Sequence, residues 1–130
     1  MLLHHYGFAT SDLSSTVATY GIMGYRPVSE MIIDPLQNVK IIFIQKDKDP
    51  LIELIEPMSI SSPVSEIIKK NGACLYHIGY EVENINETIR QLRQKKFIMI
   101  SKLVPAIAFN NRLIGFLYQK NMGLIELIQL

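Results

Sequence analysis

The chain has 130 residues, of which 48% are hydrophobic and 19% charged, and its net charge is +1. This length and composition are typical of one compact domain, and so small a net charge gives no field that would attract nucleic acid. The longest apolar runs are strand-sized, well below the ~20 residues that span a bilayer, and the start of the chain lacks the basic residues of a signal peptide. We therefore expect a cytoplasmic protein with neither a nucleic-acid nor a membrane partner.

Two further residue types have an ordinary structural interpretation. Cys74, the single cysteine, excludes an internal disulfide and is expected to be a small buried hydrophobe. The basic residues between 90 and 96 are expected to form a solvated helix end.

The first half of the sequence has the pattern of a β-α-β-β-β module. Residues 2–9 alternate as in a strand, with His5 on one face and His4 on the other. Asp12 can cap the start of a helix, and Gly24 can end it in a left-handed conformation. The elements expected here are a strand at 2–9, a helix at 13–23, and strands at 26–33, 39–45 and 51–56.

A linker leads to a second module with the same order of elements. Ser62 and Pro63 form an N-cap with proline at the first helical position. Asn84, with Glu87 three residues later, matches a capping box at the place equivalent to Asp12. The elements expected here are a helix from 63 to 70, a strand at 74–82, a helix from the Asn84 cap to about 95, and strands at 97–102, 106–109, 113–118 and 124–129, the second of these four being a strand or a loop. We expect one domain over 1–130, with module one at 1–57, a linker helix at 58–72 and module two at 73–130.

The two modules share sequence as well as pattern. Residues 51–55 read Leu-Ile-Glu-Leu-Ile, and the same five letters return at 124–128, an offset of 73. His77, which like His5 is followed two residues later by glycine, stands at an offset of 72 from it. Each module therefore begins with a histidine and ends with a glutamate.

These four residues, His5, Glu53, His77 and Glu126, are candidate metal ligands. Each glutamate has apolar neighbours on both faces of its strand, so it is either at an exposed edge or buried with a partner, because an unpaired buried charge is costly. Its occurrence twice, each time in a module that begins with a histidine, favours one shared site. Two imidazoles and two carboxylates suit divalent Co, Zn, Ni, Mn or Fe(II) more than Ca or Cu(I). His4, predicted on the helix-packed face, is interpreted as structural.

The motifs resemble those of the vicinal oxygen chelate superfamily, which includes glyoxalases, bleomycin resistance proteins and dioxygenases. They are most similar to those of the methylmalonyl-CoA epimerases. The segments concerned are His5-x-Gly-x-Ala-x-x-Asp-Leu, Leu-Ile-Glu53-Leu-Ile-Glu-Pro, Ser62-Pro63, Tyr76-His77-Ile-Gly and Leu-Ile-Glu126-Leu. The resemblance implies an α+β glyoxalase-like fold, in which two βαβββ modules form a cupped mixed sheet and the first and last strands of each supply metal ligands. It also implies a homodimer.

The chemistry implied by the resemblance is a 1,1-proton transfer on a small acyl thioester through a metal-stabilised enolate. Glu126 is the candidate catalytic base as well as a ligand. Two positions depart from the family pattern. Lys40, on the third strand of module one, stands where a catalytic group is sought, although a solvent-facing lysine is the favoured interpretation. Residues 104–111 lack the usual glycines, and Ile107 and Phe109 are available to fill space there.

Other functions of the same fold remain open. A glyoxalase I-like lactoylglutathione lyase uses similar ligands on a hemithioacetal, and the substrate would distinguish it. A ring-cleaving dioxygenase normally uses two histidines and one carboxylate, so Glu53 as a fourth ligand argues against it. A metal-free protein that binds a small molecule such as an antibiotic is the contrasting class, and its members usually lack the full ligand set.

Overall fold

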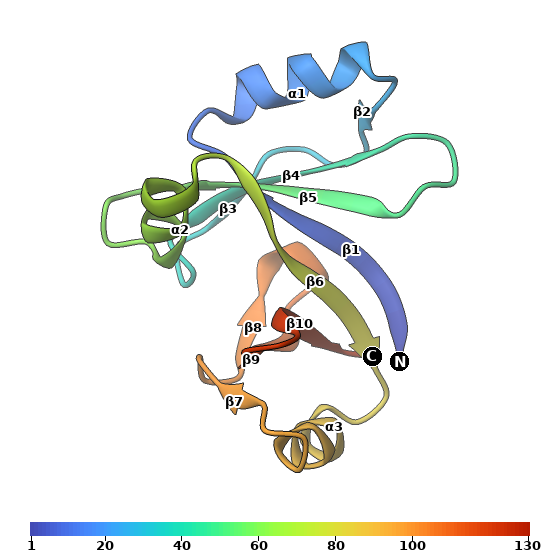
Figure 1. Cartoon of the computed structure of the whole chain (residues 1–130). Helices are drawn as coiled ribbons and strands as arrows, with labels where there is room; N and C mark the ends of the chain where they lie inside the picture. Colours follow the sequence, from blue (N-terminus) through green and yellow to red (C-terminus); the bar gives the residue numbers. More distant parts are fainter. The chain divides into compact units, whose positions relative to one another are not determined.

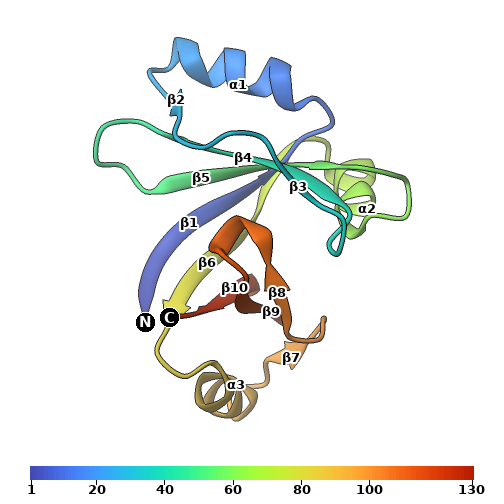
Figure 2. The same cartoon turned by 180° about the vertical axis from the view of Figure 1, so that it is seen from behind.

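The chain forms ten strands and three α-helices in a computed structural model that describes residues 1–130 (Figures 1 and 2). The elements are β1 (Leu2–Ala9), α1 (Leu13–Ile22), β2 (Arg26–Pro27), β3 (Ile32–Asp34), β4 (Val39–Gln45), β5 (Leu51–Pro57), α2 (Pro63–Asn71), β6 (Cys74–Val82), α3 (Ile85–Arg93), β7 (Ile98–Met99), β8 (Val104–Ala106), the 3₁₀-helix η1 (Ile107–Phe109), β9 (Arg112–Gln119) and β10 (Gly123–Gln129). Contacts divide the chain into two compact units, one of residues 5–76 and one of residues 1–4 with 77–130. None of the helices combines the length and apolar character needed to cross a membrane.

The 5–76 unit is a mixed sheet covered by α1. Its strands run in the order β2-β4-β5-β1, with β3 also beside β4. β1 and β5 are parallel, whereas β4 and β5 are antiparallel. Figure 1 shows α1 lying along β4 and β5. Leu13 of α1 is buried there with Ile44, Ile52 and Leu54, and this cluster is the core of the unit.

The other unit repeats this arrangement. Its strands run in the order β6-β10-β9-β7, with β8 also beside β9. β6 and β10 are parallel, and β10 and β9 are antiparallel. Ile85 and Ile89 of α3 are buried with Leu117 and Leu127. The duplication read from the sequence is therefore a duplication of topology and of core.

The helices begin as expected. Asp12 accepts a hydrogen bond from the Ser15 N–H, and Asn84 accepts one from the Glu87 N–H, both at 3.0 Å. The reciprocal half of the expected capping box is absent, because the Glu87 carboxylate accepts hydrogen bonds from Arg90 instead.

The same two helices end earlier than predicted, at Ile22 and Arg93. In each, a residue with positive φ turns the chain: Gly24 (φ +98°) and Lys96 (φ +69°). The next residue then donates its N–H to a carbonyl in the last turn of the helix, as in a Schellman motif. Tyr25 donates to Tyr20 O, and Phe97 donates to Leu92 O.

The outer strand of each module is shorter than predicted. The run expected at 26–33 is split into β2 and β3, and the strand expected at 97–102 is reduced to β7. Both outer strands are interrupted by the same kind of contact. Ser29 accepts the N–H of Phe43, and Ser101 accepts the N–H of Phe116, at 2.9 and 3.1 Å. A side-chain oxygen thus replaces one backbone acceptor of the ladder.

Candidate functional site

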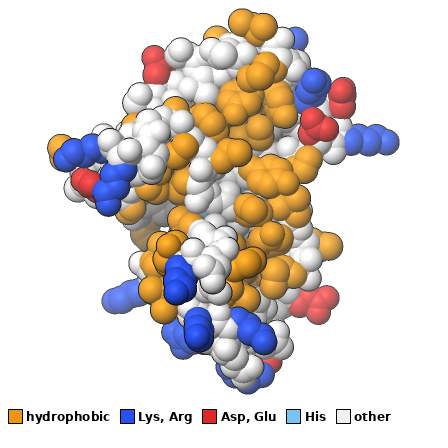
Figure 3. All heavy atoms as spheres, viewed as in Figure 1, with side chains coloured by type: hydrophobic (Ala, Val, Ile, Leu, Met, Phe, Trp, Pro, Cys, Tyr) orange, Lys and Arg blue, Asp and Glu red, His pale blue; other side chains and the backbone are white.

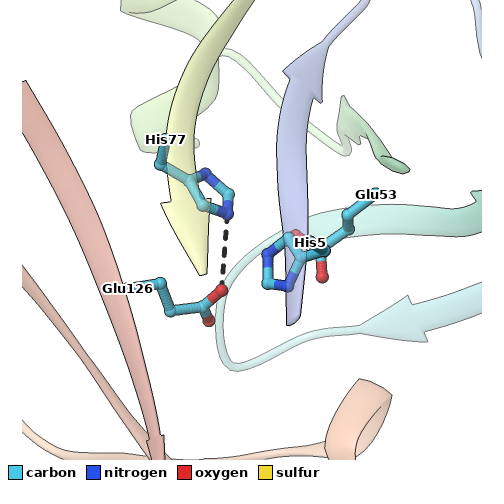
Figure 4. Close-up of side chains that lie close together, drawn as sticks. All are labelled: His5, Glu53, His77 and Glu126. Atoms are coloured by element: carbon cyan, nitrogen blue, oxygen red, sulfur yellow. Dashed lines mark ion pairs between the residues drawn. The ribbon is translucent and has the colours of Figure 1, made fainter. Parts of the chain in front are cut away.

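His5 and Glu53 come together within the 5–76 unit. In the β1–β5 ladder Glu53 is the partner of Gly7, and His5 lies two residues earlier on the same face of β1. Because Gly7 has no side chain, the space beside Glu53 is left to the imidazole. His5 Nε2 is 3.7 Å from Glu53 Oε1, and the two residues are 0% and 3% exposed. Figure 4 shows both side chains.

His77 and Glu126 form the equivalent pair in the other unit. Glu126 of β10 is the partner of Gly79 of β6, and His77 lies two residues before that glycine. His77 Nε2 is 3.4 Å from Glu126 Oε2, the ion pair drawn as a dashed line in Figure 4. Both residues are buried, as are His5 and Glu53. The alternative interpretation, in which the glutamates lie at exposed strand edges, is therefore wrong.

The spacing of the His77–Glu126 pair fits two ligands of one cation, and that of the His5–Glu53 pair is close to it. Two ligand atoms at about 2.0–2.2 Å from an ion, at tetrahedral or octahedral angles, are separated by roughly 2.8–3.6 Å. The His77–Glu126 separation of 3.4 Å falls within this range, and the His5–Glu53 separation of 3.7 Å lies just beyond it. A neutral imidazole and a carboxylate are also the donors that the divalent ions of the first transition row prefer.

Each pair has an aromatic neighbour that the sequence reasoning missed. The ring of Phe43 lies 6.1 Å from that of His5 at an interplanar angle of 81°, and the ring of Phe116 lies 5.3 Å from that of His77 at 85°. Both phenylalanines are the antiparallel partners of the glutamates, Phe43 of Glu53 and Phe116 of Glu126. A signal was present in the sequence, because Phe43 and Phe116 are separated by the same 73 positions as the glutamates.

Three residues singled out in the sequence have other contacts. His4 lies edge-on to Phe109 of η1, with ring centroids 5.3 Å apart, in agreement with a structural role. Lys40 is the ladder partner of Glu56, and its Nζ is 4.0 Å from Glu56 Oε2. Cys74 begins β6 as predicted, but it is only half-buried rather than buried.

Residues 104–111 make a tight turn without glycine. β8 is followed directly by η1, and the turn is completed by Asn110 (φ +56°) and Asn111 (φ +62°). Asparagine is among the few residues that adopt the left-handed region readily. The strand considered at 106–109 lies instead at 104–106. Phe109 is buried, whereas Ile107 is 48% exposed.

The basic side chains near the end of α3 are exposed, as expected of a solvated helix end. Figure 3 shows basic side chains at the surface of this region. Arg90 donates two hydrogen bonds to Glu87, at 2.6 and 2.9 Å. These bonds hold the pKa of the Glu87 carboxyl below its usual range and raise the pKa of Arg90.

Comparison with known proteins places the chain in a family. Residues 4–116 match the model of the Glyoxalase/Bleomycin resistance protein/Dioxygenase superfamily. The chain is 34% identical over 131 residues to the mitochondrial methylmalonyl-CoA epimerase of Homo sapiens, covering 98% of this chain and 73% of that protein. It is 30% identical to the ethylmalonyl-CoA/methylmalonyl-CoA epimerase of Cereibacter sphaeroides, covering 98% and 96% of the two chains.

A solved structure shares the fold of this chain. A hypothetical protein from Bacillus halodurans superimposes with a TM-score of 0.86 at 29% identity, covering 98% of this chain and 93% of that one. The α+β glyoxalase-like fold expected from the sequence is thereby confirmed. With its duplicated modules and the match over most of its length, the chain belongs to the glyoxalase/bleomycin resistance protein/dioxygenase superfamily, and its homologues include methylmalonyl-CoA epimerases.

Proposed function

We propose that this chain is a metal-dependent epimerase that removes and returns the α-proton of a small acyl-CoA thioester. The observation that carries the proposal is the buried histidine-glutamate pair, present once in each unit with the same strand positions. The identity of 34% and 30% to epimerases of malonyl-type CoA thioesters supports both the reaction and the substrate class.

We propose that the two pairs together bind one divalent cation, Co, Zn, Ni, Mn or Fe(II), through His5, Glu53, His77 and Glu126. All four residues are buried and offer ligand atoms. Two carboxylates balance the charge of a divalent ion. When bound, the cation supplies positive charge that stabilises the negative charge arising on a thioester oxygen as the α-proton leaves.

Glu126 is the proposed catalytic base, as the family resemblance implies. The carboxylate can accept a proton, and the β10 backbone on which it stands is held on both sides, by β6 and by β9. Burial excludes water that would compete for the same proton. A second base, on the opposite side of the substrate carbon, is not assigned to any residue.

The test combines metal analysis with α-proton exchange. We expect about one divalent metal per chain in protein purified without chelators, none in the His77→Ala, Glu126→Ala double variant, and metal-dependent deuterium exchange at the α-carbon of methylmalonyl-CoA. Metal without exchange would overturn the proposed substrate and lead to other thioesters and to the glutathione hemithioacetal. Absence of metal after reconstitution would overturn the enzyme assignment in favour of a binding protein.

A matched pair of variants separates binding from catalysis. Glu53→Gln and Glu126→Gln each keep an oxygen ligand and lose one charge, so both should bind the metal more weakly. At saturating metal, exchange should persist in Glu53→Gln and fall by about 10²- to 10⁴-fold in Glu126→Gln, because an amide cannot accept the proton. Equal exchange in the two saturated variants would contradict the assignment of Glu126.

The expected homodimer and cytoplasmic location stay predictions. Light scattering during size-exclusion chromatography would measure the mass of the particle against the 14.8 kDa of one chain.

A further inference from the structure

Each candidate glutamate lies in a row of three residues across three strands. Glu53 has Gly7 on one side and Phe43 on the other, and Glu126 has Gly79 and Phe116. In both rows the glycine places no side chain beside the glutamate, and the histidine two residues earlier approaches that carboxylate. The phenylalanine closes the other side of the glutamate, and its ring reaches the same imidazole.

The backbone of each phenylalanine is held by the outer strand through the same two contacts. Phe43 donates its N–H to Ser29 Oγ and accepts the N–H of Val28, at 2.9 and 2.8 Å. Phe116 donates to Ser101 Oγ and accepts from Ile100, at 3.1 and 3.0 Å. The interruption of the outer strand in each module therefore stands directly beside the phenylalanine.

We infer that Phe43 and Phe116 are positioning residues that orient the imidazoles of His5 and His77. An imidazole on a strand turns about a broad terminal torsion, so the backbone alone does not decide where its Nε2 points. A phenyl ring perpendicular to the imidazole limits that rotation, and aromatic rings prefer this T-shaped contact. The inference rests on the proposed function, because the orientation matters only if Nε2 binds a cation.

The duplication supports a role beyond filling space. Either contact alone could be ordinary core packing. The contact is present in both units. In each, the phenylalanine has a glutamate as its ladder partner, nearly the same ring angle to the histidine, and a serine that accepts its backbone N–H. These shared features tie the contact to the histidine-glutamate pair, which is also duplicated.

The experiment measures metal affinity in Phe43→Leu and Phe116→Leu against two controls. Phe8→Leu and Phe97→Leu also remove one ring from the hydrophobic interior, but Phe8 packs on Tyr20 and Phe97 lies in the α3 core. Affinity for Co(II) is measured by competition with a chromophoric chelator, and the visible spectrum of bound Co(II) reports the ligand geometry. Urea unfolding of the metal-free proteins gives the stability of each variant.

We expect Phe43→Leu and Phe116→Leu each to bind Co(II) about 3- to 10-fold more weakly and to shift its visible bands. The controls should lose comparable stability while keeping the affinity within about twofold and the spectrum unchanged. Phe43→Leu and Phe116→Leu test the inference independently. If one of them fails to fold, the metal affinity of the other still decides the outcome.

The double variant His77→Ala, Glu126→Ala distinguishes two kinds of failure. If it binds Co(II) as tightly as the wild type, or if the wild type binds none, the proposed function fails and the inference fails with it. If the double variant loses Co(II) while Phe43→Leu and Phe116→Leu keep wild-type affinity and spectrum, the proposed function stands and the inference alone is overturned. Equal loss of affinity in the two controls would also overturn it.

Discussion

Alternation of side chains along β4 separates Lys40 from the His5–Glu53 pair. Phe43 is opposite Glu53 in the β4–β5 ladder, and Lys40 is opposite Glu56. Since successive side chains point to opposite faces, an odd number of positions places Lys40 and Glu56 on the face away from Glu53. That is the face of Leu54, which packs with α1. Lys40 therefore lies on the opposite side of the sheet from the His5–Glu53 pair and is not placed to act as a catalytic group beside it.

We expect Lys40→Ala to leave metal affinity and α-proton exchange within about twofold of wild type. Its side chain is 39% exposed and its ion pair with Glu56 is long, so the free energy of unfolding should change by less than about 1 kcal/mol. Urea titration and the exchange assay measure the two quantities, with Glu53→Ala as the control on the opposite face. A loss of exchange comparable to that of Glu53→Ala would contradict this placement.

At the scale of elements, α1 is held at its N-terminus by two carboxylates, because Glu56 accepts the N–H of Leu13 and Asp12 that of Ser15, and elsewhere by packing. It has no acidic residue in its first turn and no basic residue in its last turn. Tyr20 packs edge-on against Phe8 of β1 and against Tyr25, with ring centroids 5.7 and 5.3 Å apart. Burial raises the pKa of the Tyr20 phenol, and the nearby Tyr25 raises it further.

This pKa gives α1 a pH dependence of known sign. A raised pKa means that the folded protein favours the neutral phenol, so the contribution is complete below the ordinary tyrosine pKa of about 10 and is lost as the pH rises through the folded pKa. We expect the urea midpoint of wild type to fall more between pH 9 and 11, the range that spans that value of about 10, than the midpoint of Tyr20→Phe. The exposed Tyr118→Phe is the control, and it should follow wild type. Identical falls in wild type and Tyr20→Phe would contradict the assignment.

At the scale of the whole molecule, the two units have equivalent strand orders and separate cores. The single domain expected over residues 1–130 stays a prediction. A single domain over these residues requires that the two units unfold in one cooperative transition. The proposed cation adds a second requirement, because its ligands come from both units and its binding should stabilise both.

We expect calorimetry to give one transition whose calorimetric and van't Hoff enthalpies agree. Metal at about 100 times its dissociation constant should stabilise the folded chain by about 2.7 kcal/mol and raise the midpoint of that single transition by roughly 10 °C. His77→Ala, Glu126→Ala should show the transition without the metal-dependent rise. Two transitions, only one of which moves with metal, would contradict both the single domain and the shared cation.

The sequence by itself determined the repeat, the order of elements, the helix caps and the four histidine and glutamate positions. These follow from local signals, namely alternation, capping residues and identical letters at a constant offset. Only the tertiary structure decided that Lys40 faces away from Glu53, that Phe43 and Phe116 reach the histidines, and that a serine hydroxyl interrupts each outer strand. Those facts depend on the register between strands distant in the chain, and a shift of one residue would reverse every face.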